Sequence, residues 1–274
     1  MATVELTRRL LGGDDPTADE QYVELLRDQS KWREALQAAR EASVKYPGQR
    51  SLLWYQAATL TDLGRIDEGV ALLRGQLKNT PEDVRSYIQI SALYTQANRG
   101  AEAVAAARKA LEQTPAANQK LQTIVLLSLS SAQEKAGDPR GSEESLRRVL
   151  SQEPNNAQAL NNLGYFLIER NERLEEAAGM IQRALRADPF NSSYLDSLGW
   201  AYYKLGKLEE AERYLSDAAR RSANSVAIQE HLGDVLLKRG KLAEARLAWQ
   251  KALELSGEAA ETSRLRAKLN TNKK

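Results

Sequence analysis

Apolar and small residues recur three and four positions apart along most of the chain, a spacing typical of amphipathic helices. A representative stretch carries two such stripes, separated by a glycine. The first consists of Leu195, Leu198 and Tyr202, and the second of Leu208, Ala211, Leu215 and Ala218. The pattern predicts pairs of helices joined by tight turns and therefore an all-α fold.

Prolines and glycines divide the chain at regular intervals. Proline has no N–H and disfavours the α conformation in the residue before it, so each of five prolines is predicted to end the second helix of a pair. These are Pro47, Pro81, Pro115, Pro154 and Pro189, spaced 34, 34, 39 and 35 residues apart. Four glycines at mid-repeat positions are predicted to form turns with positive φ, namely Gly64, Gly137, Gly206 and Gly240.

Three segments share a Leu-Gly pair at one position of this repeat. They are Leu160–Gly164, Leu195–Tyr202 and Gln229–Gly233, and the following helices carry Ala211, Leu215 and Ala218, then Ala245, Trp249 and Ala252. These residues resemble the signature of the tetratricopeptide repeat (TPR) family. The resemblance implies a right-handed superhelical solenoid of about seven helix-turn-helix repeats with a C-terminal capping helix.

The spacing of these prolines and glycines predicts the repeat boundaries. We expect residues 1–15 to form an N-terminal helix or linker, which could be the remnant of a longer chain. Repeats 1 to 7 are predicted at 16–49, 50–83, 84–117, 118–156, 157–191, 192–225 and 226–259. Residues 260–274 are predicted to form a capping helix, with Leu265 and Leu269 on one face, and a basic tail from Lys268 that frays into solvent.

Small residues are predicted at the crossings of paired helices. Gly164, Gly199 and Gly233 should face Ala177, Ala211 and Ala245 and allow close approach. Repeat 4 has about five extra residues, which lengthen its first helix to about Gln119–Lys135. That helix either packs on repeat 3 or presents an apolar ridge to a partner.

In TPR proteins the first helix of each repeat lines the concave face, so the resemblance assigns candidate ligand contacts. They are Trp54 and Tyr55 in repeat 2, Asn161, Asn162 and Tyr165 in repeat 5, Asp196, Trp200 and Tyr203 in repeat 6, and His231 and Asp234 in repeat 7. Such a mixture of aromatic rings and hydrogen-bonding groups suits a peptide ligand.

Each of these positions also has a structural interpretation. The aromatic residues could pack against the adjoining repeat, whereas the amides Asn161 and Asn162 gain little from packing and are the better ligand candidates. Asn118, Asn156 and Asn191 are instead interpreted as turn or N-cap residues. A carboxylate clamp like that of one TPR subclass is not expected, because Asp196 and Glu230 stand where cations would be needed.

Composition narrows the choice of function. There are 39 Lys and Arg against 37 Asp and Glu, interleaved along the chain, which argues against a nucleic-acid partner. Cysteine is absent, which excludes disulfides and thiolate chemistry. No apolar run is long enough to span a bilayer directly, and the first residues lack the features of a signal peptide. We expect a soluble protein, cytoplasmic by default, or periplasmic if the chain is part of a longer lipoprotein.

No catalytic motif emerges from the sequence. His231 is the only histidine, and neither a nucleophile elbow nor a phosphate-binding loop is present. We therefore expect a non-enzymatic adaptor or scaffold that needs no cofactor or metal and binds a protein or peptide client in its groove. Two alternatives stay open, a self-assembling homo-oligomer and the regulatory arm of a longer enzyme. The C-terminal repeats are also similar to those of bacterial TPR lipoproteins and adaptors.

Overall fold

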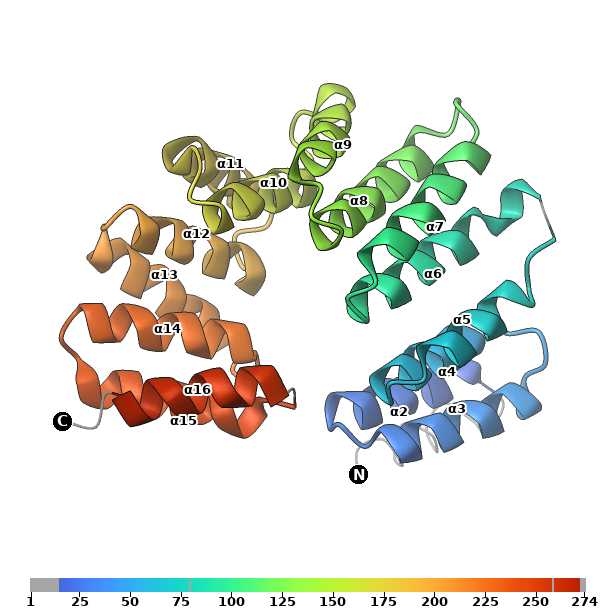
Figure 1. The fold of residues 1–274 in the computed structure, drawn as a ribbon, viewed down its shortest axis with the longest axis horizontal. Helices are drawn as coiled ribbons and strands as arrows, with labels where there is room; N and C mark the ends of the chain where they lie inside the picture. Colours follow the sequence, from blue (N-terminus) through green and yellow to red (C-terminus); the bar gives the residue numbers. More distant parts are fainter. Residues whose placement is uncertain (1–14, 79, 258, 272–274) are drawn as a thin grey trace. The chain divides into compact units, whose positions relative to one another are not determined.

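The computed structural model describes residues 15–78, 80–257 and 259–271, and every regular element within these ranges is a helix. The chain divides into an N-terminal unit, Met1–Ser145, and a C-terminal unit, Leu146–Lys274 (Figure 1). The predicted helix or linker at 1–15 lies outside the described residues, except for Asp15, whose carboxylate caps the first described helix.

The helices follow one another as paired first and second helices of the predicted repeats. The N-terminal unit contains α2 (Pro16–Asp28), α3 (Trp32–Lys45), α4 (Arg50–Asp62), α5 (Ile66–Arg74), the 3₁₀ turn η1 (Pro81–Asp83), α6 (Val84–Gln96), α7 (Gly100–Gln113) and α8 (Gln119–Lys135). Helix α9 (Pro139–Gln152) crosses the boundary between the units. The C-terminal unit continues with α10 (Ala157–Glu169), α11 (Leu174–Ala187), α12 (Ser192–Lys204), α13 (Leu208–Arg221), α14 (Val226–Lys238), α15 (Leu242–Leu255) and α16 (Ala259–Thr271).

The helix boundaries follow the predicted caps and turns. The side chains of Asn118, Asn156 and Asn191 each accept a backbone N–H of the helix that follows, which confirms their N-cap role. The four predicted turn glycines all have positive φ, between 72° and 77°. Ser30, Asn98 and Asn171 take the equivalent left-handed position in repeats 1, 3 and 5, where the sequence offers no glycine.

Close helix crossings depend on the small residues that the sequence singled out. A Cβ added to Gly164 would lie 2.9 Å from the carbonyl oxygen of Ala177, and one added to Gly199 would lie 3.3 Å from that of Ala211. Repeat 2 reverses this arrangement: its glycine is on the second helix, and a Cβ on Gly69 would lie 2.6 Å from the carbonyl oxygen of Ala57. One small residue on each helix is thus enough to bring the two backbones together.

The long helix α8 spans the residues predicted for it. Val125, Leu126 and Leu129 are buried, and α8 packs on both α6 and α7 of repeat 3. The packing interpretation of its apolar run is therefore correct, although Ile124 is half exposed.

Repeat 2 departs from the prediction at its second helix. The prolines were expected to end the second helices, but α5 ends at Arg74, seven residues before Pro81. Its C-cap is Gly75, and the next described helical element is η1. Helix α5 has 9 residues, whereas the other second helices, such as α3 and α7, have 14. Helix α5 is therefore about one and a half turns shorter than the other second helices.

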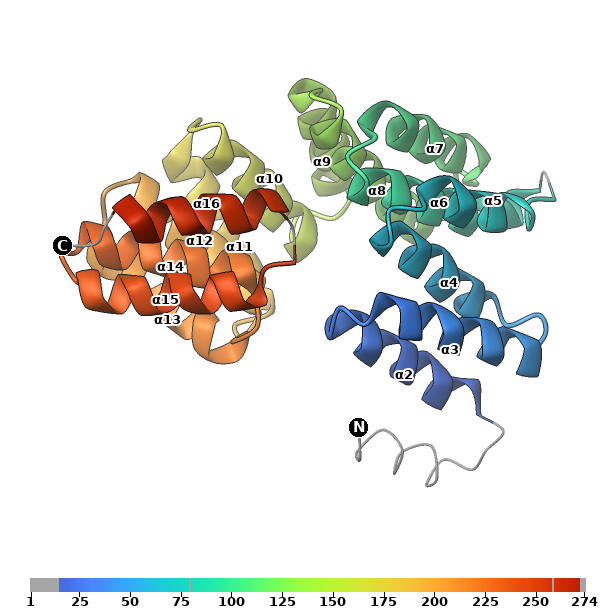
Figure 2. The same cartoon turned by 60° about the horizontal axis from the view of Figure 1, so that its bottom comes forward.

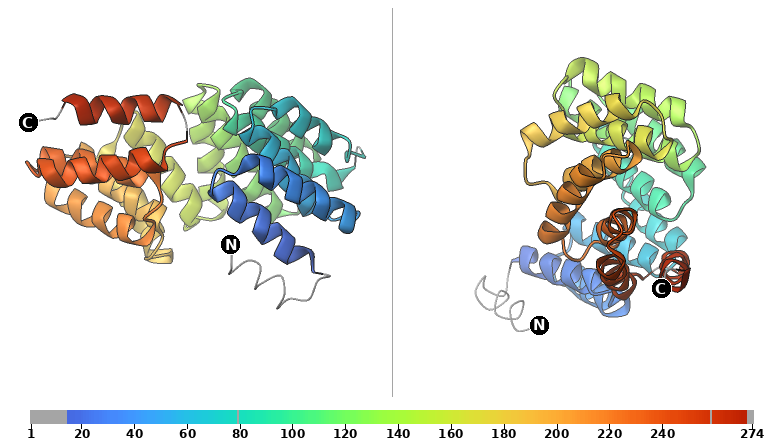
Figure 3. Two further views of the ribbon diagram at one scale, coloured as in Figure 1. Left: turned by 90° about the horizontal axis from the view of Figure 1, so that it is seen from below. Right: turned by 90° about the vertical axis from the view of Figure 1, so that its left-hand side faces the viewer.

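The final helix covers the end of the C-terminal unit. Helix α16 packs on α15, as Figure 2 and Figure 3 show, and Leu265 is fully buried there with Leu269 beside it. This confirms the predicted cap, which keeps the apolar side of the last repeat from water. The basic tail was expected to fray from Lys268 onward, and that was wrong for residues 268–271, which belong to α16, where Lys268 also forms ion pairs. The rest of the tail, residues 272–274, lies outside the described residues.

Candidate protein-interaction sites

All ten predicted contact residues lie on first helices. Trp54 and Tyr55 are on α4 of the N-terminal unit. The remainder belong to the C-terminal unit: Asn161, Asn162 and Tyr165 on α10, Asp196, Trp200 and Tyr203 on α12, and His231 and Asp234 on α14. These eight residues, with Glu169 and Glu230, are called the first-helix face of the C-terminal unit below.

Acceptors on one first helix bind donors on the next along this face. The indole N–H of Trp200 donates to Oε1 of Glu169 at 2.9 Å. Nδ1 of His231 lies 2.9 Å from Oδ1 of Asp196. Both bonds join residues about one repeat apart, so they tie neighbouring repeats together.

The capping helix α16 contacts the next first helix, α14, in the same way, but through charged groups. Arg264 of α16 donates two hydrogen bonds to Glu230, of 2.8 and 2.7 Å. Lys268 lies 2.7 Å from both oxygens of Asp234 and 2.8 Å from Glu230. Asp234 also accepts the indole N–H of Trp249 at 3.0 Å. Glu230 and Asp234 are therefore already engaged by the chain itself.

These contacts shift two pKa values. Burial alone would raise the pKa of Glu230, but the hydrogen bonds and charges of Arg264 and Lys268 outweigh it and lower that pKa to about 2. Burial alone would lower the pKa of His231, but the bond to Asp196 and the charges of Asp196, Asp234 and Glu169 raise it above its ordinary value. When His231 is protonated, its Nδ1–H donates to Oδ1 of Asp196.

The aromatic residues of repeat 6 are used largely in packing. The ring of Trp200 stacks on Tyr203 with centroids 4.6 Å apart and on His231 at 4.2 Å, with interplanar angles of 7° and 13°. Lys204 lies 5.2 Å from the Trp200 ring. Burial and the charge of Asp234 raise the pKa of Tyr203, which lowers the ionised fraction of its hydroxyl further. This cluster holds α12 and α14 together.

Helix α10 differs from α12 and α14 in having a buried side-chain polar atom without a hydrogen-bond partner among the described residues. The side chain of Asn161 is buried, with 8% of the residue exposed, and its Oδ1 has no hydrogen-bond partner in the part of the chain that the structure describes. Asn162 and Tyr165 are half-buried beside it on the same helix. Burial, together with Glu169 and Asp196, raises the pKa of Tyr165 to about 12, so its hydroxyl is a neutral donor. Each of these three residues carries both an acceptor oxygen and a donor, so the helix offers several of each close together.

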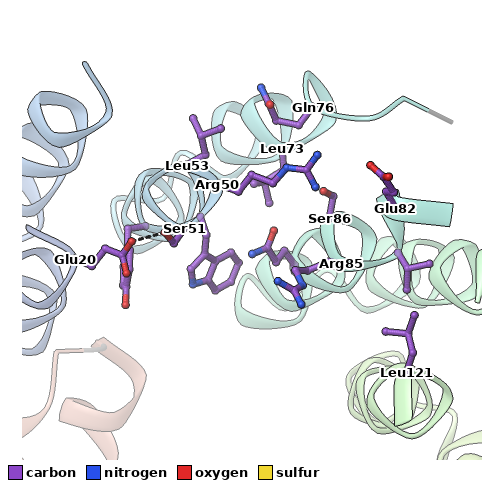
Figure 4. Close-up of a pocket in the computed structure, with 14 residues that line it drawn as sticks. Glu20, Arg50, Ser51, Leu53, Leu73, Gln76, Glu82, Arg85, Ser86 and Leu121 are labelled. Carbon is purple, nitrogen blue, oxygen red and sulfur yellow. Dashed lines mark hydrogen bonds between the residues drawn. The ribbon is translucent and has the colours of Figure 1, made fainter. Parts of the chain in front are cut away.

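In the N-terminal unit, Trp54 and Tyr55 line a cavity of about 460 Å³ between α4, α5 and α6 (Figure 4). Trp54 also packs against the core of repeats 2 and 3, and Tyr55 against α2 and α3. Arg85 and Gln89 of α6 line the same cavity. The sequence did not indicate the cavity itself or the part of Arg50 and the end of α5 in forming it.

No cluster of three or more potential metal ligands occurs within the described ranges, and no helix among the described residues is long and apolar enough to cross a membrane.

Comparison with known proteins identifies the family. The model described as "Tetratricopeptide repeat" matches residues 23–84, 127–192 and 197–261, which is more than half of the chain. The chain belongs to the tetratricopeptide repeat family. A tetratricopeptide repeat protein from Parabacteroides merdae has the same fold, with a TM-score of 0.65 at 16% identity over 96% of this chain and all of that one. The predicted all-α TPR solenoid is confirmed.

Two relatives come from Pseudomonas aeruginosa. A protein named TPR repeat-containing protein is 34% identical over 180 residues, and the type IV pilus assembly protein PilF is 29% identical over 174 residues. The matched regions cover 65% and 62% of this chain. The chain spans only 30% of the first relative and 66% of the second. The TPR fold, in general, supports a role as a protein-interaction scaffold.

Proposed function

We propose that this protein is a non-catalytic adaptor that binds a segment of a client protein on the first-helix face of its C-terminal unit, with α10 as the anchor. The observation that carries the proposal is the buried Oδ1 of Asn161, which has no partner among the described residues. A buried acceptor left unpaired costs about 1–3 kcal/mol. The oxygen itself has almost no exposed surface, so the proposal requires the Asn161 side chain to rotate toward the ligand, whose N–H then recovers that stabilisation.

The adjoining residues support a peptide ligand. Asn162 and the Tyr165 hydroxyl can bond to the amides and carbonyls of an extended chain, while the tyrosine ring contributes apolar contact area. By contrast, Asp196, Trp200, His231 and Asp234 are bonded within the chain. These four residues hold neighbouring helices together, whereas the residues of α10 keep polar groups that can form hydrogen bonds with a ligand.

The relatives fit this role without naming the client. PilF is named as a pilus assembly protein, and an adaptor that brings proteins together is consistent with its likeness to this chain. No catalytic step is part of the proposal, since TPR proteins generally act by binding.

The test is client capture by the double variant Asn161→Ala, Asn162→Ala. Circular dichroism should show unchanged helicity, and client proteins captured by the wild type, identified by mass spectrometry, should be lost. A matched control removes two exposed amides from second helices, Gln37→Ala and Gln250→Ala, and should capture normally. Full capture by the Asn161, Asn162 variant would remove α10 from the binding site.

A further inference from the structure

The short helix α5 leaves a gap at a position where five of the other six repeats have a buried alanine and repeat 4 has the buried Val149. Near the ends of five second helices a buried alanine packs against the next repeat, and none is more than 3% exposed. These are Ala42, Ala110, Ala184, Ala218 and Ala252. The equivalent residue of repeat 2 is Gln76, which follows the end of α5 and is exposed. Helix α5 therefore lacks the last turn, which carries the alanine in those repeats.

The cavity of about 460 Å³ lies at this gap and has a mixed lining. Leu53, Leu73, Val84 and Leu121 give it an apolar wall, and Trp54 lies half-buried on one side. Cavities of about 300–1,000 Å³ with such walls and a few polar groups are typical ligand sites. This one has room for a large apolar side chain together with its neighbour.

The polar groups of the cavity include two arginines without partners. Arg50 begins α4 and Arg85 lies in the first turn of α6, and neither forms a hydrogen bond or ion pair with any described residue. The first turn of a helix disfavours a cation by about 0.3–1 kcal/mol, so local structure does not explain their placement. Figure 4 shows both side chains in the space between α4 and α6.

Two carboxylates lie at the ends of the same cavity. Glu20 accepts hydrogen bonds from Gln49 and Ser51, which engages its charge. Glu82 is exposed on η1, near the start of α6, where the helix dipole stabilises an anion. The guanidinium groups of Arg50 and Arg85 lie between them, are exposed to water and are free to pair with a ligand.

We propose that this cavity binds a protein segment in which a large apolar side chain is next to an acidic one. The apolar side chain enters between Leu73 and Trp54, and its acidic neighbour pairs with Arg50 and Arg85. Arginine suits this role because its planar guanidinium can bind a carboxylate through two hydrogen bonds. This second site lies in the N-terminal unit and does not depend on the α10 anchor.

The probe is a short acetylated and amidated peptide, Ser-Glu-Leu-Glu-Ser, titrated into the full-length ¹⁵N-labelled protein. The indole N–H signal of Trp54, assigned with Trp54→Phe, should shift as the peptide binds. Replacing both Glu by Gln in the peptide should weaken binding at least tenfold. Replacing Leu by Ala should weaken it about tenfold. Raising the salt from about 0.05 to about 0.5 M should weaken the Glu peptide but not the Gln peptide.

Protein variants separate this site from general charge effects. Arg50→Gln, Arg85→Gln should abolish the shift, whereas Arg33→Gln, Arg40→Gln, which removes the same charge from exposed positions on α3, should leave it unchanged. Asn161→Ala, Asn162→Ala should also bind the peptide normally, so a failure of the α10 site is distinguishable.

Three results would overturn the proposal: no Trp54 shift with the Glu peptide, equal binding of the Glu and Gln peptides, or equal loss in the two arginine variants. A shift of the same size with sodium acetate alone would also overturn it, because the site would then bind any small anion and not a protein segment.

Discussion

Gly164 and Gly179 lie on the two helices of one hairpin, α10 and α11, and their replacement by alanine should have opposite effects. A Cβ on Gly164 would lie 2.7 Å from Cγ1 of Ile181 and 2.9 Å from the carbonyl oxygen of Ala177. Ile181 is fully buried and the carbonyl belongs to a helix backbone, so neither can move freely. A Cβ on Gly179 would meet nothing within 4 Å.

The magnitudes follow from two terms. Alanine is favoured over glycine inside a helix by about 1 kcal/mol, and both variants gain this amount. Only Gly164→Ala also overpacks the crossing, at a cost of about 1–3 kcal/mol. Gly179→Ala should therefore stabilise the protein by about 1 kcal/mol. Gly164→Ala should be less stable than Gly179→Ala by about 1–3 kcal/mol.

Urea unfolding followed by circular dichroism gives the comparison. Because a repeat array can unfold in parts, amide hydrogen exchange should be measured in α10 and α11 of both variants. Exchange should be faster in Gly164→Ala and slower in Gly179→Ala than in the wild type. A Gly164→Ala protein as stable as Gly179→Ala would show that the crossing has room to spare and refute the close-packing argument.

Three further predictions concern single residues. Gly75→Ala should raise the free energy of unfolding by about 0.5–1 kcal/mol in urea unfolding, because Gly75 has helical φ and ψ of −62° and −13° and its added Cβ makes only ordinary contacts at 3.5 Å; lower stability would contradict this. Glu230→Gln should loosen the cap and speed amide exchange in α16, because it removes the carboxylate that forms ion pairs with both Arg264 and Lys268. In the wild type, the stabilisation by Glu230 is complete above a pH of about 4.5 and falls as the pH drops toward the pKa of Glu230, which is about 2. His231 has a raised pKa, so its stabilisation is complete below about pH 6.5 and is lost as the pH rises through the higher pKa of the folded state. His231→Gln should reduce the fall of the urea unfolding midpoint as the pH rises through this range. An unchanged fall would mean that another group causes it.

The fold was predictable because its signals are local. Leu-Gly pairs, prolines and mid-repeat glycines each act within one helical hairpin, and the extent of α8 followed from a count of residues between prolines. Left-handed turns at Ser30 and Asn98 were missed because the prediction relied on glycine, although asparagine also tolerates this conformation. The early end of α5 was missed for a similar reason: Pro81 was interpreted as the stop, whereas Gly75 and Gln76 already break the alanine pattern.

The candidate sites were only partly predictable, because the repeat pattern gives the direction of a side chain and not its partners. It placed Trp200 and Asp234 correctly on first helices, but their stacking and ion pairs depend on rotamers and on α16. The pairs Glu230–Arg264 and Asp234–Lys268 are both 34 residues apart, one repeat length, and that spacing was a usable signal. The unpaired Oδ1 of Asn161 carries no signal in the sequence.

The role of α10 can be tested most directly by site-specific photo-cross-linking. A benzophenone amino acid is placed at position 162 on α10 and, as a matched control, at the exposed position 175 on α11. Irradiation in cells followed by mass spectrometry should give adducts with the same client proteins at position 162 that the wild type captures, and none at position 175. Client adducts at position 175 without any at position 162 would contradict the account.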